Sequence, residues 1–261
     1  MTFTDQIGHQ IILNSTPKRI VSAVPSQTEL LFDLGLENKV VGITKFCIHP
    51  KKWFESKQRV GGTKTLNISK IQELKPDLII ANKEENTKEQ ILELQKLFPV
   101  WTSNISTLDE SLEMINQIGL MTSTLDESTE IFQKIVFDFE RLQKFEFKES
   151  KVLYLIWKKP YMTVGKNTFI NNIMQKVGFK NLIDSTEDYP VLSEEQIMVY
   201  SPDLILLSSE PYPFKEKDVL EFKNLCPKAQ ILLVDGEMFS WYGSRLTKTV
   251  DYLIDLYRKI N

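Results

Sequence analysis

The sequence predicts an α/β protein built from two similar halves. Short apolar runs bounded by turn residues alternate with amphipathic segments along most of the chain, which is the pattern of parallel strands joined by crossover helices. The stretch 70–81 is echoed 126 residues later by the stretch 196–207. Between the two alternating regions, residues 123–145 contain neither Gly nor Pro, so we expect one long helix to join the halves.

Composition bounds the class of protein. The 261 residues are 42% hydrophobic, which is enough for a sizeable core. Lys and Arg number 32 against 35 Asp and Glu, a net charge of −3, whereas nucleic-acid-binding proteins usually show a basic excess. No apolar run reaches the roughly 18 residues of a membrane span. With only two cysteines, Cys47 and Cys226, we expect free thiols rather than a disulfide framework.

The first residues are typical of a strand pair. Phe3 and the apolar run 11–13 flank a turn around Gly8. The same segment lacks the basic and apolar regions of a secretory signal. Two alternatives stay open from the residues alone: a cytoplasmic protein, or a chain whose leader has been removed.

A buried strand and a helix with a marked start follow. The run 19–23 is short and apolar. Ser26 and Glu29 have the spacing of a capping box, and Gly35 lies where the helix should end.

The same alternation continues to the end of the chain. Further strands are predicted at 40–43, 77–81, 100, 152–156, 204–207 and 231–234, and further helices at about 71–74, 87–98, 107–121, 168–177, after 193 and from 244. We therefore divide the chain into an N-terminal α/β lobe (1–122), a connecting helix (123–148) and a C-terminal α/β lobe (149–261).

The internal echo supports this division. KIQELKPDLIIA and QIMVYSPDLILL both run from a helix through Pro-Asp into a buried strand. Pro76 and Pro202 cannot continue a helix, and the apolar strand begins at once. We interpret the echo as a duplicated architecture.

Signatures of catalysis are largely missing from the sequence. It contains no G-x-S-x-G elbow, no phosphate-binding G-x-x-x-x-G-K-[ST] loop and no G-x-G-x-x-G. The histidines are His9, in the predicted hairpin turn, and His49. We therefore expect a protein that is not an enzyme, with no catalytic residues, metal or cofactor.

Cys47 and His49 follow the strand 40–43, on the side where open α/β sheets bind ligands. Several readings stay open. They could be half of a metal site, which lacks a second pair of ligands, or a nucleophile and its base. They could also be a packed thiol and a hydrogen-bonded imidazole, or an imidazole that reaches a ligand.

Aromatic residues gather after predicted strands. The segment 234–245 places Phe239, Trp241, Tyr242 and Arg245 before the last helix. Exposed rings indicate a surface meant to be covered, although they could instead plug the base of that helix. Further aromatics occupy comparable loops: Phe46, Trp157, Tyr161, Tyr189 and Tyr212. Two such halves predict a cleft for a large, flat, partly apolar ligand.

Several motifs then carry a resemblance to a known family. They are Arg19-Ile-Val-Ser, Pro25-Ser-Gln-Thr-Glu-Leu-Leu, Val41-Gly-Ile-Thr, Val60-Gly-Gly, the two Pro-Asp-Leu-Ile strands and Val164-Gly. Over nearly the whole chain the sequence resembles the class III periplasmic substrate-binding proteins of ABC importers, the helical-backbone metal receptors, which carry cobalamin, ferric siderophores or haem. The resemblance implies two Rossmann-like lobes with parallel sheets joined by one long backbone helix.

Within that family the sequence is most similar to cobalamin-binding members. Phe46 matches an aromatic residue that contacts the corrin, and Arg245 matches an arginine near the final helix. Thr63 and Asn82 stand where the family has tryptophans. The resemblance thus implies a corrinoid ligand, with haem or a ferric siderophore as alternatives. The missing secretory signal suggests a further alternative, an intracellular corrinoid carrier.

The resemblance also implies a monomer that docks on an ABC transporter permease outside the cytoplasm. One acidic residue per lobe makes that contact in the family. Glu195 matches it in the second lobe, whereas Ser69 breaks the pattern in the first. Glu84 or Glu85 could substitute, or could simply be a solvated cap. A rigid connecting helix predicts a small change of shape on binding.

Overall fold

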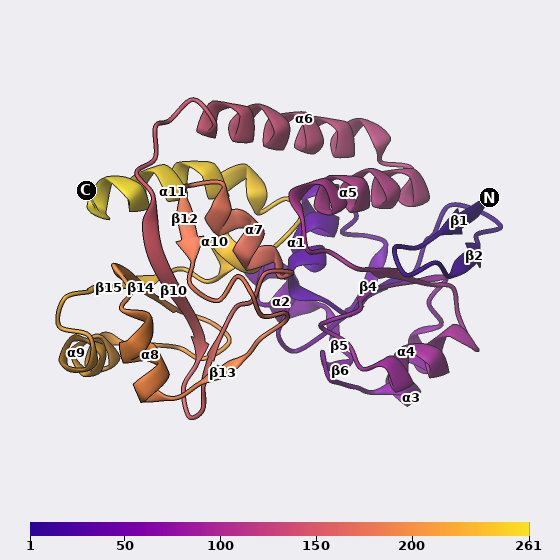
Figure 1. Cartoon of the computed structure of the whole chain (residues 1–261). Helices are drawn as coiled ribbons and strands as arrows, with labels where there is room; N and C mark the ends of the chain where they lie inside the picture. Colours follow the sequence, from indigo (N-terminus) through magenta and orange to yellow (C-terminus); the bar gives the residue numbers. More distant parts are fainter. Residues whose placement is uncertain (261) are drawn as a thin grey trace. The chain divides into compact units, whose positions relative to one another are not determined.

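The computed structural model describes residues 1–260 and divides into two compact units (Figure 1). Unit 1 comprises Met1–Ile105, Asp109–Ile135 and Tyr242–Arg245. Unit 2 comprises Ser106–Leu108, Val136–Trp241 and the last helix from Leu246. The chain therefore passes between the units more than once, and a four-residue segment near its end belongs to unit 1.

Unit 1 contains a five-stranded sheet with helices on both faces. Its sheet strands are β3 (Ile20–Ser22), β4 (Val40–Ile43), β5 (Gln58–Arg59), β8 (Leu78–Asn82) and β9 (Val100–Ser103). Its helices are α1 (Pro25–Asp33), α2 (Lys51–Ser56), α3 (Ile68–Leu74), α4 (Lys88–Gln95) and α5 (Leu108–Thr122). Two short hairpins complete it: β1 (Thr2–Thr4) with β2 (Gln10–Ile12), and β6 (Gly61–Gly62) with β7 (Thr65–Leu66).

The sheet of unit 1 is parallel throughout and runs β5-β4-β3-β8-β9. Numbered along the chain, this is the 3-2-1-4-5 order of a Rossmann-like sheet. The order reverses at β3, the central strand, all three residues of which are buried. In such sheets ligands bind outside the carboxyl ends of the strands near this reversal.

Both faces of this sheet are covered by helices. On one face, Val21, Ile79 and Val100 pack with Ile71 of α3 and Leu94 of α4. Helices α1 and α5 lie on the other face (Figure 1). Because β3, β8 and β9 are buried on both sides, they appear in the sequence as continuous, largely apolar runs.

The N-terminal hairpin confirms the predicted strand pair, with Gly8 at a φ of 86° in its turn. The turn covers the open edge of β9. Thr102 donates its backbone N–H to Asp5 Oδ2 at 3.1 Å, and Gln6 donates its own to the Thr102 carbonyl at 3.2 Å. The hairpin thus satisfies backbone groups that an edge strand would otherwise expose.

The start of α1 differs from the prediction. Val24 is the N-cap residue, Pro25 occupies the first turn, and no side chain caps the helix. The expected capping box of Ser26 and Glu29 is therefore wrong, because both residues lie inside the helix. The end is as predicted: the helix stops at Asp33, and Gly35 follows with a φ of 73°.

Unit 2 contains a six-stranded sheet and five helices of its own. Its strands are β10 (Ser150–Trp157), β11 (Tyr161–Thr163), β12 (Phe179–Asn181), β13 (Val191–Leu192), β14 (Leu204–Ser208) and β15 (Gln230–Val234). Its helices are α7 (Phe169–Gln175), α8 (Glu194–Tyr200), α9 (Glu216–Leu225), α10 (Glu237–Ser240) and α11 (Leu246–Ile260).

The sheet of unit 2 is mixed rather than purely parallel. Its order is β13-β11-β10-β14-β15, with β12 also paired to β10. Strands β12, β14 and β15 are joined by parallel pairing to β10 or to each other, whereas β11 pairs antiparallel with β10 and β13. The expectation of a parallel sheet holds for the centre and misses this antiparallel side. Strands of two or three residues carry too little periodicity to detect.

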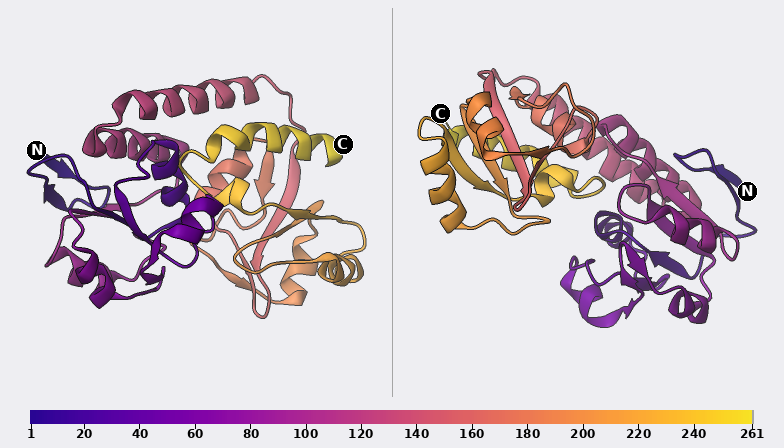
Figure 2. Two further views of the ribbon diagram at one scale, coloured as in Figure 1. Left: turned by 180° about the vertical axis from the view of Figure 1, so that it is seen from behind. Right: turned by 60° about the horizontal axis from the view of Figure 1, so that its bottom comes forward.

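Helices lie on both faces of the unit 2 sheet (Figures 1 and 2), and alternate residues of β10 pack on opposite faces. Leu153 and Leu155 belong to a core that includes Ile197 of α8 and Phe222 of α9. Tyr154 points to the other face, where its ring centroid lies 5.1 Å from that of Phe239. This alternation is the two-residue period of a strand.

The internal echo is confirmed in three dimensions. The N-caps Asn67 and Ser193, the left-handed C-caps Lys75 and Ser201, and the aspartates Asp77 and Asp203 are related by the same offset. Asp77 accepts the backbone N–H of Arg19, and Asp203 accepts that of Lys151. Each Pro-Asp pair therefore ties the end of one helix to the start of the next strand along the sheet.

The long helix predicted between the halves is α6 (Leu125–Leu142), which is shorter than the segment 123–145. Ile135, Phe139 and Leu142 form its buried stripe, as their spacing predicts. Phe137 lies on its outer side and is 66% exposed.

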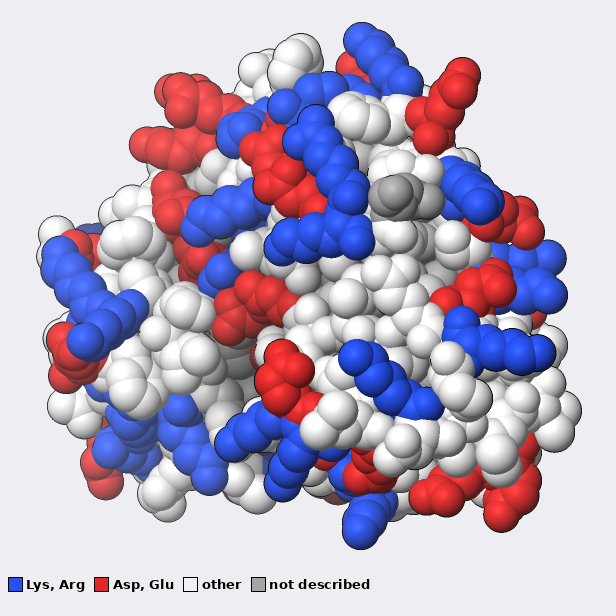
Figure 3. Space-filling model, turned by 90° about the vertical axis from the view of Figure 1, so that its left-hand side faces the viewer, with Lys and Arg blue, Asp and Glu red and all other residues white. Residues whose placement is uncertain are grey.

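Lys and Arg side chains and Asp and Glu side chains are both spread over the face shown in Figure 3. Within residues 1–260 no helix is both long and apolar enough to cross a membrane.

Candidate functional site

The candidate residues of unit 1 cluster at the carboxyl ends of its strands. Phe46, Cys47 and His49 follow β4, and Glu84 and Glu85 follow β8. These strands lie on either side of β3. The sequence prediction therefore places these side chains at the edge where Rossmann-like sheets bind ligands.

Phe46 presents its ring to solvent. It is 51% exposed, and the Lys45 ammonium lies 5.0 Å from the ring centroid. Ile48, two residues on, is 46% exposed. An exposed aromatic beside an exposed aliphatic residue forms an apolar surface that a ring-shaped ligand could cover.

Cys47 has no exposed surface. Its sulfur contacts the hydroxyls of Thr28 at 3.0 Å and Thr44 at 3.1 Å. Burial raises the pKa of the thiol, and these hydrogen bonds only partly oppose the rise. The thiol is therefore a packed core group that does not reach a ligand, and a nucleophilic role would require a thiolate at an accessible position.

His49 is half-buried beside Pro50. Among residues 1–260, no group of three or more His, Cys, Asp and Glu side chains is arranged to hold a metal ion. The role of His49 as a residue that reaches a ligand stays a prediction.

Arg245 forms a buried ion pair. Its Nε donates to Glu29 Oε2 at 2.8 Å, and each side chain is 8% exposed. The pair holds the segment Tyr242–Arg245 within unit 1. Arg245 therefore anchors this segment, a role that the sequence prediction of a ligand-contacting arginine did not include.

Tyr242 is also buried, at 7% exposure. Burial, together with the nearby charge of Glu85, raises the pKa of its hydroxyl well above the usual value. Gly243, with a φ of 109°, donates its N–H to Ser111 Oγ at 3.3 Å. The expectation that rings of this segment stand exposed on a loop is wrong for Tyr242.

Glu84 and Glu85 lie on an exposed turn after β8. Their backbone N–H groups donate to Asn82 Oδ1 at 2.8 and 3.0 Å. Desolvation by the surrounding protein atoms raises the pKa of the Glu85 carboxyl. The positive charge of Lys64 opposes this rise, and the negative charge of Glu84 adds to it. Asn82 itself is buried against Ser103. A buried side chain of the sheet therefore holds the backbone of this turn in place.

In unit 2, Trp157 ends β10 and is 38% exposed. Its ring meets that of Tyr212 edge to face, with centroids 5.8 Å apart. Tyr212 packs in turn on Phe214, which lies in the core. The partly exposed indole thus packs on Tyr212, which packs on the core residue Phe214, and these ring contacts limit its movement.

Tyr161 is buried and bound by carboxylates. Its hydroxyl donates to Glu221 Oε1 at 2.7 Å and lies 3.3 Å from Glu194 Oε1. Burial, reinforced by these acids, raises the pKa of the hydroxyl. At 7% exposure, Tyr161 links α8 to α9 rather than offering an open ring face.

An ion-pair network adjoins Tyr161. Lys158 Nζ lies 2.7 Å from Asp218 Oδ1 and 2.6 Å from Glu221 Oε2. Burial disfavours the charge of Asp218, but the hydrogen bonds from Lys158 and the Lys215 N–H outweigh it and hold its pKa below the usual value. Hydrogen bonds from Lys158 and Tyr161 likewise lower the pKa of Glu221.

The lowered pKa values of Asp218 and Glu221 predict that unit 2 is less stable in acid. A carboxyl whose folded pKa lies below its unfolded pKa adds stability above the unfolded pKa, and that stability is lost as the pH falls through the folded pKa. We therefore expect unit 2 to lose stability as the pH falls below about 4 to 5. The measurement is chemical denaturation across pH, in which Asp218→Asn should give a flatter profile; an identical slope would contradict the prediction.

Tyr189 and Glu195 lie on either side of β13. Tyr189 is half-buried. Glu195 is exposed in the first turn of α8, where hydrogen bonds from Ser193 and from its own backbone N–H lower its pKa. With Met198 at 47% and Val199 at 82% exposure, it forms the outer face of α8, because these residues lie three and four positions apart.

The loop after β15 turns its rings inward. Phe239 has no exposed surface, and its ring centroid lies 6.2 Å from that of Tyr252 in α11. Phe239 therefore packs against α11 and offers no exposed ring face. Trp241 is 6% exposed, and its Nε1–H donates to Glu210 Oε1 at 2.9 Å.

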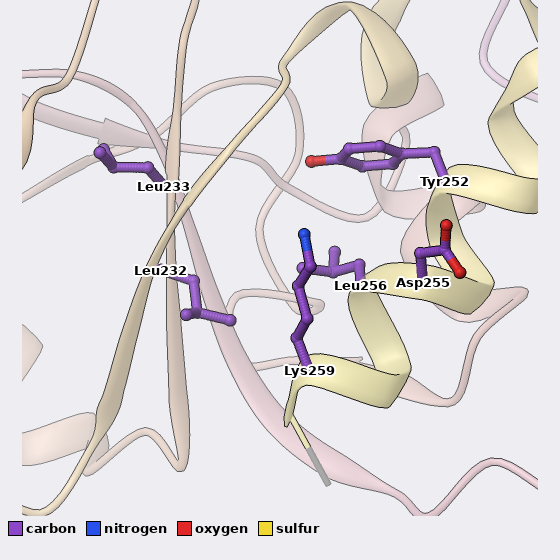
Figure 4. A pocket seen from close by; sticks show the side chains of 6 residues that line it. All are labelled: Leu232, Leu233, Tyr252, Asp255, Leu256 and Lys259. Atoms are coloured by element: carbon purple, nitrogen blue, oxygen red, sulfur yellow. The ribbon is translucent and has the colours of Figure 1, made fainter.

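A cavity of about 180 Å³ lies elsewhere in unit 2, between β15 and α11 (Figure 4). Its lining consists of Leu232, Leu233, Tyr252, Asp255, Leu256 and Lys259. None of the residues predicted from the sequence lines it.

Several polar residues of these sites were missed by sequence reasoning. They are Glu29, Lys158, Glu210, Asp218 and Glu221. A charged residue is normally solvated, so nothing in the sequence marks one that pairs with a distant partner. For Lys158 and Glu210 a signal was available, because each follows a largely buried strand within two residues.

Taken together, each unit contains an α/β sheet with a partly exposed aromatic ring at the carboxyl end of a strand. This arrangement is that of a ligand-binding protein of the two-unit α/β class. The chain belongs to the periplasmic binding protein family, whose pattern it matches over residues 20–224.

Relatives agree with this family. A Vitamin B12-binding protein of Vibrio cholerae is 32% identical over 199 residues, which cover 73% of this chain and 70% of that protein. The ABC transporter substrate-binding lipoprotein YvrC of Bacillus subtilis, itself uncharacterized, is 26% identical over 98% of this chain and 84% of its own length.

A solved structure shows that the fold is shared. The periplasmic vitamin B12 binding protein BtuF of Vibrio cholerae superposes with a TM-score of 0.80, covering 94% of this chain and 98% of the other at 23% identity. The two-unit α/β fold predicted from the sequence is thereby confirmed.

Proposed function

We propose that this chain is the substrate-binding protein of an ABC importer, that it acts outside the cytoplasm as a monomer, and that its ligand is a corrinoid. The observation that carries the ligand class is the 32% identity to a Vitamin B12-binding protein over 73% of this chain. The importer class is supported by the likeness to a substrate-binding lipoprotein of an ABC transporter.

The exposed rings supply a physical basis for corrinoid binding. Phe46 is 51% exposed in unit 1, and Trp157 is 38% exposed in unit 2. Phe46 follows β4 and Trp157 ends β10, each at the carboxyl end of its strand, and we propose that both rings contact the ligand. Burial of such rings contributes about 25 cal/mol for each square ångström removed from water.

Two positions, Thr63 and Asn82, differ from the cobalamin-binding members that the sequence resembles, so the identity of the ligand has to be tested. Thr63 and Asn82 are 8% and 2% exposed, and Asn82 is bound to Ser103 at 2.9 Å. Neither offers a ring, although the family has tryptophans at both places. Haem or a ferric siderophore is therefore a competing ligand within the same function.

A competition experiment decides between these ligands. Native mass spectrometry of the chain with cyanocobalamin, haem and a ferric hydroxamate at equal concentration is expected to show one corrinoid per chain. A complex with haem or the ferric chelate alone would replace the ligand and keep the function. No complex with any of the three would contradict the function itself.

We propose that the outer face of α8, with Glu195 at its centre, docks on the permease. A carboxylate flanked by exposed Met198 and Val199 suits a basic residue set in an apolar surface. We expect Glu195→Lys to reduce ligand-stimulated ATPase activity of the reconstituted transporter by at least about tenfold, with ligand affinity unchanged. Glu187→Lys, on an exposed loop of the same unit, is the matched control and should leave both unchanged; equal activity of the Glu195 variant would contradict the assignment.

A further inference from the structure

Two loops of unit 2 are locked together by one glutamate. Glu210 lies in the loop after β14, and its Oε1 accepts the Ser240 hydroxyl at 2.6 Å and the Trp241 indole N–H at 2.9 Å. Trp241 lies in the loop after β15, directly beyond α10. Because β14 and β15 are adjacent parallel strands, both loops lie at the same carboxyl edge of the sheet.

Further contacts keep the two loops in fixed register. The Gly236 N–H donates to Ser209 Oγ at 2.9 Å. A Cβ at Gly236 would collide with Ser208 Oγ and would lie 2.7 Å from Glu210 Cγ, so the side-chain stem of Glu210 packs against the backbone there. Glu210 is therefore held along its length, and its carboxylate is not a freely moving surface group.

We propose that Glu210 is a positioning residue for ligand binding, which fixes the orientation of the Trp241 indole at the ligand-binding edge of unit 2. This inference rests on the proposed function. The indole is 6% exposed, so its orientation decides which part of the ring meets a ligand. Since its N–H is committed to Glu210, Trp241 contacts the ligand through ring carbons, as suits the apolar rim or face of a flat macrocycle.

The acceptor oxygen, rather than the charge, is what the geometry requires. Glu210→Gln keeps a carbonyl oxygen on a side chain of the same length, whereas Glu210→Ala removes the acceptor. We expect Glu210→Ala to weaken cyanocobalamin binding about tenfold, because it removes the hydrogen bond that orients the Trp241 indole. Glu210→Gln should bind within about threefold of the wild type.

A double-mutant cycle separates positioning from other roles. In a Trp241→Phe background, which has no indole N–H, Glu210→Ala is expected to change the dissociation constant no further. An equal loss in both backgrounds would overturn the proposal, because Glu210 would then act on the ligand or the fold independently of Trp241.

A readout without ligand keeps the two proposals distinguishable. In an ¹H–¹⁵N spectrum the indole signal of Trp241, identified by its loss in Trp241→Phe, should move upfield in Glu210→Ala and remain in place in Glu210→Gln. An unmoved signal in Glu210→Ala would overturn the hold of Glu210 on the ring. If the wild-type chain binds neither cyanocobalamin, haem nor a ferric siderophore, the proposed function fails and the ligand role of Glu210 fails with it, whatever the spectrum shows.

Discussion

Replacing Glu29 with alanine is expected to lower the free energy of unfolding of unit 1 by about 3–5 kcal/mol. Arg245 Nε donates to Glu29 Oε2 at 2.8 Å, and both side chains are 8% exposed. The variant removes this carboxylate and leaves the guanidinium in a largely dry environment, which costs more than the pair itself contributes.

The measurement is denaturant unfolding followed by tryptophan fluorescence. Trp53 and Trp101 report on unit 1, because both are fully buried there. Trp157→Phe with Trp241→Phe removes the two tryptophans of unit 2 and isolates that signal. Glu29→Gln keeps a hydrogen-bond acceptor and should lose less stability, and Glu29→Leu with Arg245→Met should recover most of it.

The outcome also decides what Arg245 does. A loss below about 1 kcal/mol for Glu29→Ala would contradict an anchoring role, since surface pairs contribute that little. Arg245 would then be available to a ligand, as the family resemblance implies. A large loss assigns it to holding the segment Tyr242–Arg245 in unit 1.

Removing the exposed rings of both units is expected to weaken corrinoid binding about 100-fold. Each ring leaves roughly 100 Å² to be covered, and at about 25 cal/mol per Å² even half of that burial amounts to about 1.3 kcal/mol, or nearly tenfold, for each residue. Phe46→Ala and Trp157→Ala should therefore each weaken cyanocobalamin binding about tenfold, and their effects should add if the sites are independent.

Calorimetric titration of the two single variants and the double variant measures this directly. Phe137→Ala is the control, because Phe137 is 66% exposed on α6 and belongs to neither candidate site. Affinity unchanged in the double variant would show that the ligand, if bound, does not use these rings.

The sequence predicts the fold well for physical reasons. Fully buried parallel strands such as β8 and β14 must be continuous apolar runs, and a helix joined to such a strand needs a stop, which Pro76 and Pro202 supply. The duplicated caps and aspartates follow from the same requirement in both units. Short antiparallel strands such as β11 leave no such pattern.

The candidate site was predicted only in part. Phe46 and Trp157 are exposed at strand ends, as the position of aromatics after apolar runs suggested. Phe239 is buried because the single turn of α10 directs it beneath α11, and four residues are too few to show a helical period. The Glu29–Arg245 pair joins residues 216 positions apart, a distance over which local pattern carries no information.

Oxidative footprinting of side chains tests the central proposal that the chain binds a corrinoid through exposed aromatic rings. Hydroxyl radicals label exposed rings, so Phe46, Trp157 and Phe137 should all react in the free chain. With saturating cyanocobalamin we expect protection of Phe46 and of Trp157, and unchanged labelling of Phe137. Labelling of both rings unchanged at saturation would contradict the proposal.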